Sequence, residues 1–160
     1  MSEEFLMEYR RSIEDPITFW ESQASKLYWR ERWVKAYDDS NPPFYKWFVG
    51  GKTNIAYNAV DRHLSLGRTN KAALIWVSST GEVRILRYYD LFREVNRLAA
   101  VLRSLGVGKG DRVAIYMPMI PEAMIAMLAV NRVGAVHTVI FSGFGAQRFR
   151  IELRMRMRSS

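Results

Sequence analysis

Apolar positions recur at helical spacing in the middle of the chain, which is 160 residues long. Between residues 88 and 105 they follow one another at steps of four, three and four: Leu91, Val95, Leu98 and Leu102. This spacing places apolar side chains on one face of an α-helix. Gly106 follows directly, and glycine is a common residue just past a helix end. The pattern predicts one helix over residues 88–105.

A β-hairpin is expected before this helix. A mostly apolar run over residues 72–78 is followed by the turn Thr80-Gly81 and by a second run over residues 82–87 that alternates polar with apolar. Two strand patterns around a short glycine-containing turn are typical of two antiparallel strands.

A βαβ unit is expected after the helix. It consists of an apolar strand over residues 111–117, a helix that Pro121 opens and Gly134 ends, and a second apolar strand over residues 135–141. Such units join parallel strands by a right-handed crossover. Because ligands of these sheets bind beyond the carboxyl ends of the strands, residues 141–144 mark the place to look for a site.

The first part of the chain is aromatic and less regular. Asp15-Pro16 is a helix-start signal, and we expect a helix from there to Arg32. Asn41-Pro42-Pro43 breaks the chain, and we interpret the aromatic segment over residues 44–51 as a loop packed on the protein. A short helix over residues 54–64 follows.

These elements suggest three regions. Residues 1–70 form a helical and aromatic extension, residues 71–147 a partial α/β sheet domain, and residues 148–160 a basic tail.

Composition narrows the class of protein. The hydrophobic content is 49% and there is no cysteine, so we expect a globular core and exclude disulfides, cysteine zinc sites and a thiol nucleophile. No segment reaches about 18 uninterrupted apolar residues, and residues 1–11 lack the apolar core of a signal peptide. We expect a cytoplasmic protein without a membrane partner.

The formal net charge of +8 is uneven along the chain, because half of it comes from the last fifteen residues. Three interpretations of this arginine-rich end remain: a disordered basic tail, a nucleic-acid-binding arm, or translation out of frame past a deletion. We favour the first and the last, and do not expect a nucleic-acid partner.

The sequence offers few candidates for catalytic or ligand-binding residues. The glycines of residues 106–110 follow a helix and open a strand, the reverse of a dinucleotide-binding fingerprint, so we interpret them as a helix end and turn. His63 and His137 have no spacing typical of a metal site, and we expect structural, hydrogen-bonded roles for both. We name no catalytic residue and no metal ligand.

Three ordered blocks carry a resemblance to a known family. They are W-F-V-G-G at residues 47–51 with N-I-A-Y-N-A-V-D-R-H at 54–63, G-D-R-V-A-I-Y-M-P at 110–118, and the stretch from P-E at 121–122 through G-A-V-H at 134–137 to F-S-G-F at 141–144. Over about residues 10–147 the chain resembles the N-terminal portion of AMP-forming acetyl-CoA synthetases and their propionyl-CoA and 3-hydroxypropionyl-CoA relatives. Ala59 stands where many members have cysteine, which looks harmless.

The resemblance implies the fold and chemistry of that family. The fold class is α/β, an incomplete N-terminal part of the adenylate-forming large domain with a βαβ unit and a β-hairpin. The family ligates a small carboxylic acid to CoA through an acyl-adenylate, with ATP and Mg²⁺ as cofactors. By resemblance, Phe141, Ser142 and Gly143 form part of the surface that meets CoA.

The resemblance ends at Arg148, where family members continue with a phosphate loop and a catalytic lysine. We therefore expect a truncated short-chain acyl-CoA synthetase that is inactive alone, binds ATP, CoA and Mg²⁺ weakly if at all, and self-associates through an uncovered sheet. The alternative is an interaction or regulatory module that binds an acidic partner through its arginine tail.

Overall fold

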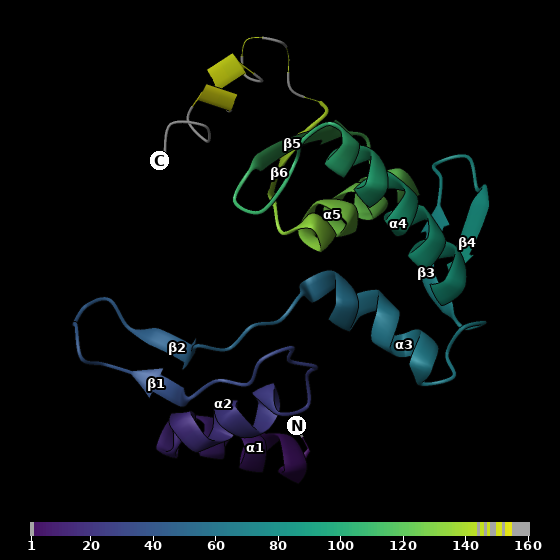
Figure 1. The fold of residues 1–160 in the computed structure, drawn as a ribbon. Helices are drawn as coiled ribbons and strands as arrows, with labels where there is room; N and C mark the ends of the chain where they lie inside the picture. Colours follow the sequence, from purple (N-terminus) through teal and green to yellow (C-terminus); the bar gives the residue numbers. More distant parts are fainter. Residues whose placement is uncertain (1, 144, 146, 148–149, 152, 155–160) are drawn as a thin grey trace. The chain divides into compact units, whose positions relative to one another are not determined.

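The computed structural model describes the chain except residues 1, 144, 146, 148–149, 152 and 155–160 (Figure 1). The chain divides into two compact units, Met1–Thr53 and Asn54–Ser160. The division lies earlier than the boundary expected near residue 70. The physical reason is that residues 57–65 form helical turns that contact a helix of the second unit.

The first unit contains two helices and one hairpin. Helix α1 spans Glu3–Glu14, helix α2 spans Pro16–Ala24, and strands β1 (Lys35–Asp38) and β2 (Lys46–Val49) pair antiparallel. The expectation of a loop over residues 44–51 was wrong where β2 forms. Helix α1 was not foreseen, although Ser2 caps it by accepting a hydrogen bond from the backbone N–H of Phe5.

Helix α2 begins as expected, since the Asp15 carboxylate accepts from the Thr18 backbone N–H and Pro16 occupies the first turn. It ends at Ala24 rather than at Arg32. The indole N–H of Trp29 donates to the carbonyl oxygen of Ala24 at 2.8 Å. In a longer helix this carbonyl oxygen would instead accept a hydrogen bond from a backbone N–H of the next turn.

An aromatic cluster holds this unit together. The ring centroids of Trp29 and Trp33 lie 4.9 Å apart, and that of Phe48 lies 5.5 and 5.0 Å from them. Phe44 is 70% exposed and Tyr45 is 55% exposed. The expected packing of the aromatic segment therefore holds for Phe48. Tyr45 stacks on Tyr37 with ring centroids 5.9 Å apart, and Phe44 remains mostly exposed.

The second unit contains the remaining elements of the α/β arrangement. It begins with the π-helical turn η1 (Tyr57–Asp61) and α3 (Arg62–Ser65), continues with β3 (Ala72–Val77), β4 (Val83–Arg87) and α4 (Tyr88–Ser104), and ends with β5 (Arg112–Met117), α5 (Pro121–Val133) and β6 (Val136–Phe141). Strands β3 and β4 pair antiparallel, and β5 and β6 pair parallel. The expected hairpin, helix and βαβ strands are confirmed.

The core of this unit lies where α4 packs on α5 and on η1. Its fully buried members include Val60, Val95 and Ala129. Burial of a valine side chain such as Val60 or Val95 contributes about 1.5–3 kcal/mol, so the unit's stability is concentrated along these helices.

Strand β6 is covered incompletely within the described residues. Val136, Val139 and Phe141 are 55%, 41% and 61% exposed. This agrees with the expectation that the strand is partly bare. No helix among the described residues is long and apolar enough to cross a membrane.

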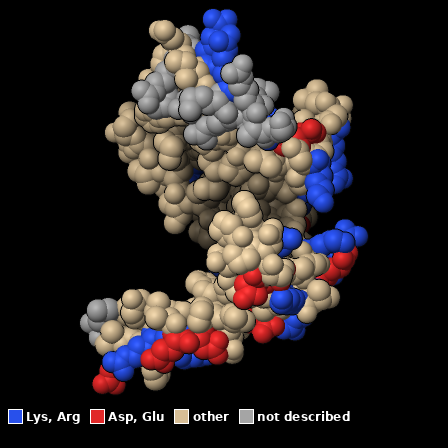
Figure 2. All heavy atoms as spheres, turned by 90° about the vertical axis from the view of Figure 1, so that its left-hand side faces the viewer, with Lys and Arg blue, Asp and Glu red and all other residues tan. Residues whose placement is uncertain are grey.

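Figure 2 shows basic and acidic side chains close to one another on one face. Exposed ion pairs among the described residues include Arg11 with Glu8 and Lys52 with Glu31. Of the basic tail, the structure describes Arg150, Ile151, Leu153 and Arg154; the remaining residues between 148 and 160 lie outside the described part.

Candidate functional site

The three residues proposed for CoA lie together at the carboxyl end of the parallel strands. Met117 is paired with Phe141, the last residue of β6, and Ser142 and Gly143 follow as a turn. We call Phe141, Ser142 and Gly143 the β6 turn. The hydroxyl of Tyr116 on β5 donates to the carbonyl oxygen of Ser142 at 2.9 Å.

The Phe141 ring lies directly over Gly143. A Cβ atom built on Gly143 would come within 2.5 Å of Phe141 Cε1, which is closer than van der Waals contact. The β6 turn thus offers an exposed aromatic ring, a close-lying glycine and peptide groups. It can stack on or pack against a ligand, but none of its three side chains can transfer a proton at neutral pH.

A groove opens next to the end of β5. Its volume is about 630 Å³, and its lining includes Arg84, Leu86, Arg93, Leu98, Met117 and Ile125. At its margin Arg84 donates to Glu122 Oε1 at 2.8 Å, which joins β4 to the first turn of α5. The hydrogen bond from Arg84 lowers the pKa of the Glu122 carboxyl, and a backbone hydrogen bond lowers it further.

The segment between β5 and α5 is held from the hairpin. The indole N–H of Trp76 on β3 donates to the carbonyl oxygen of Met119 at 2.7 Å. The Met119 side chain is 83% exposed. The backbone that leaves β5 is therefore anchored, while its methionine remains accessible.

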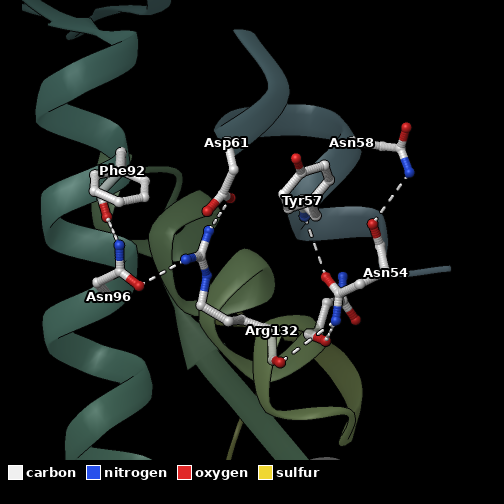
Figure 3. Close-up of polar contacts among 8 residues, drawn as sticks. Asn54, Tyr57, Asn58, Asp61, Phe92, Asn96 and Arg132 are labelled. Carbon is white, nitrogen blue, oxygen red and sulfur yellow. Dashed lines mark hydrogen bonds and ion pairs between the residues drawn. The ribbon is translucent and has the colours of Figure 1, made fainter. Parts of the chain in front are cut away.

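A polar network surrounds Arg132 on α5 (Figure 3). Arg132 Nη1 donates to Asn96 Oδ1 on α4 at 2.6 Å, and Nη2 donates to Asp61 Oδ2 on η1. Its guanidinium carbon lies 5.6 Å from the centroid of Phe92. The Arg132 and Asp61 side chains are only 18% and 19% exposed, so their charges interact with little screening by water.

Asn54 extends this network to the backbone of α5. Its side-chain amide donates to the carbonyl oxygens of Asn131 and Arg132, at 3.0 and 3.4 Å. Its Oδ1 atom accepts from the backbone N–H of Tyr57 at 3.2 Å. The Asn54 side chain therefore provides hydrogen-bond partners for backbone groups at the end of α5 and at the start of η1. This role is structural rather than chemical.

The sequence carried a weak signal for this network. Asn54, Asn58 and Asp61 lie at helical spacing beside the apolar positions of residues 54–64, which suggests one polar face. Nothing local indicates that this face meets Arg132, which is 71 residues away from Asp61.

The two histidines differ in their hydrogen bonding. His63 Nδ1 lies 3.0 Å from Arg68 Nη1 and its ring centroid 4.7 Å from that of Tyr88, which agrees with a structural, hydrogen-bonded role. His137 Nδ1 is buried and has no hydrogen-bond partner among the described residues, so that expectation does not hold for this atom. In the described part of the chain no group of three or more His, Cys, Asp or Glu residues could hold a metal ion.

Comparison with known proteins assigns both parts of the chain to one family. The model described as acetyl-coenzyme A synthetase N-terminus matches residues 7–59, and the model described as AMP-binding enzyme matches residues 62–154.

Individual relatives agree with this assignment. The 3-hydroxypropionyl-coenzyme A synthetase of Sulfurisphaera tokodaii is 55% identical over 140 residues, which cover 87% of this chain and 21% of the relative. The acetyl-coenzyme A synthetase of Pyrobaculum arsenaticum is 52% identical over 146 residues, covering 86% of this chain and 22% of the relative.

A solved structure shows the same fold. The acetoacetyl-CoA synthetase from Streptomyces lividans superposes with a TM-score of 0.84 at 33% identity, over 91% of this chain and 22% of that one. This chain thus spans about one-fifth of the length of the relatives it matches. It belongs to the AMP-forming acetyl-CoA synthetase family and corresponds to the N-terminal fragment of those synthetases.

Proposed function

We propose that this chain is the N-terminal segment of a short-chain acyl-CoA synthetase, which converts a small carboxylic acid, ATP and CoA into the acyl-CoA, AMP and pyrophosphate. The observation that carries the proposal is the pair of family matches, which together run from residue 7 to residue 154 with a short gap. In such a ligation the carboxylate attacks the α-phosphate of ATP, and the CoA thiol then displaces AMP.

Within such a synthetase, this segment contributes part of the surface that binds CoA. The β6 turn lies at the carboxyl end of parallel strands, where ligands of α/β sheets bind. The exposed ring of Phe141 and the glycine beside it suit the flat nucleotide end of CoA. Its residues bind and orient, and the acid, base and phosphate chemistry belongs to other parts of the synthetase.

Two observations on the described residues support weak binding of ATP and Mg²⁺ by this chain. These residues include no set of three acidic or histidine side chains close enough to hold a metal, and the glycines of residues 106–110 end α4 and turn into β5. We propose that the 160-residue chain binds ATP, Mg²⁺ and the acid weakly if at all, and does not complete the reaction alone.

A chimeric enzyme tests the proposal. The matching 140 residues of the Sulfurisphaera tokodaii synthetase are replaced by those of this chain, and AMP formation is measured with ATP, a short-chain acid and CoA. We expect the chimera to keep its rate within about tenfold of the parent, since residues that only bind and orient are exchanged among close relatives. The isolated 160-residue chain should form no AMP.

The matched control is the same exchange with the segment of the Pyrobaculum arsenaticum enzyme, which is similar to this chain at 52% identity. If the control chimera is active and ours is folded but inactive, the proposal is wrong. AMP formation by the isolated chain would overturn its second part.

The uncovered sheet supports a further proposal for the isolated chain. Val139 and Phe141 on β6 remain 41% and 61% exposed, and exposed apolar surface of this kind drives association. We propose that a second copy covers it. Sedimentation over a hundredfold range of concentration tests this, and a monomer throughout contradicts it.

The absence of cysteine from the sequence is compatible with the reducing cytoplasm, where we place the protein. The comparisons give no support to the alternative of an interaction module that binds an acidic partner through the arginine tail.

A further inference from the structure

Tyr116 links β5 to the β6 turn. It lies on β5 in register with Ile140 of β6, and its hydroxyl reaches past the end of β6 to the Ser142 carbonyl oxygen at 2.9 Å. The two residues are 26 positions apart in the sequence. The hydrogen bond therefore fixes a peptide group that lies beyond the last strand pairing, Met117 with Phe141.

The orientation of this peptide group decides how the rest of the turn lies. Ser142 is placed directly between Phe141, whose ring is 61% exposed, and Gly143, over which that ring lies. If the Ser142 carbonyl rotated away, the ring and the glycine would change their relative positions. Tyr116 itself is 43% exposed, so the hydrogen bond is accessible to competing water unless a ligand covers it.

We propose that Tyr116 is a positioning residue for CoA: its hydroxyl holds the Ser142 peptide so that Phe141 and Gly143 present a preformed surface. This inference rests on the proposed function, because it needs the β6 turn to meet CoA. It concerns the second half-reaction only, since the acyl-adenylate forms before CoA is used. A preformed surface lowers the entropy lost on binding.

The variant Tyr116→Phe removes the hydroxyl and keeps the ring. In the chimeric synthetase described above, we expect the KM for CoA to rise roughly two- to tenfold, the range for one lost hydrogen bond. The rate of pyrophosphate release with ATP and acid but without CoA should change less than about twofold. A merely structural role would alter both half-reactions together.

Tyr89→Phe is the matched control. Tyr89 lies on α4 and is 51% exposed, so the change removes a similarly exposed hydroxyl away from the β6 turn. Its KM for CoA should equal that of the unchanged chimera.

Carbonyl carbon chemical shifts of the isolated 160-residue chain supply a readout that needs no activity. Because the Ser142 carbonyl oxygen accepts the hydrogen bond, Tyr116→Phe should shift the Ser142 carbonyl carbon resonance, and Tyr89→Phe should not. An unchanged Ser142 resonance overturns the positioning role. A shifted resonance with an unchanged KM for CoA overturns the link between the turn and CoA. A folded but inactive unchanged chimera overturns the proposed function itself.

Discussion

At the scale of single residues, Gly134 adopts a backbone conformation that other amino acids rarely adopt. Gly134 ends α5 with φ of 83°, and a Cβ there would lie 3.4 Å from Cβ of Lys109. The left-handed conformation is costly for a residue with a side chain. Gly134 therefore directs the chain from α5 into β6.

Gly134→Ala should lower the free energy of unfolding by about 1–2 kcal/mol, because alanine strains this backbone conformation. Denaturant unfolding of the 160-residue chain measures the change. Gly108→Ala is the control, since Gly108 does not have a left-handed φ and a Cβ there would find space. Equal effects of the two substitutions would contradict the argument.

His63 contributes to the pH dependence of stability near neutral pH. Burial of the ring lowers its pKa below the ordinary value of 6.5, and the positive charges of Arg68 and Arg62 lower it further. The unfolded chain then binds the proton more readily than the folded one. The stabilisation is complete above about pH 6.5 and decreases as the pH falls through and below that value.

His63→Gln should therefore flatten the decrease in the free energy of unfolding between pH 7.5 and pH 5. The test is a series of denaturant titrations across this range for both proteins. A variant whose stability decreases with acid as steeply as that of the unchanged chain would show that His63 is not the group responsible.

At the scale of elements, the polar network around Arg132 connects η1, α4 and α5. Asp61, Asn96 and Arg132 come from these three elements and meet at the edge of the core. Removing one partner of a poorly exposed ion pair leaves the other charge without compensation. The network therefore holds η1 to α4 and α5.

Asp61→Asn should lower the free energy of unfolding by about 2–3 kcal/mol, and a double-mutant cycle with Arg132→Met should show a coupling of about 1–2 kcal/mol. The exposed pair Arg97–Glu94, with side chains 73% and 33% exposed, is the control. Its coupling should stay below about 0.5 kcal/mol. Similar couplings for both pairs would show that burial does not strengthen the Asp61–Arg132 pair.

At the scale of the whole molecule, burial is distributed unequally between the two units. Helix α1 has no buried residue, whereas Ala129 and Val130 of α5 are 0% and 1% exposed within the core. A helix without tertiary packing is marginally stable in water.

We expect amides of α1 to exchange with solvent several orders of magnitude faster than those at the centre of α5, which should open only on unfolding of their unit. Hydrogen-exchange mass spectrometry of the 160-residue chain measures both. Equal protection of α1 and α5 would contradict the unequal burial.

Much of the second unit could be predicted from the sequence, because its signals are local. The spacing of Leu91, Val95 and Leu98 identified α4, and Pro121 and Gly134 marked the ends of α5. The location of Phe141, Ser142 and Gly143 at the strand end also followed from pattern, whereas their role toward CoA stays a proposal.

Local sequence signals establish the type and order of the elements around α4 and α5, since helix periodicity, capping and turn residues act over three or four positions. Which distant groups meet is established by the packing of the elements. It ended α2 at Ala24 through Trp29, paired Asp61 with Arg132, and brought the Tyr116 hydroxyl to Ser142. Such contacts depend on how packed elements approach one another, which no local pattern specifies.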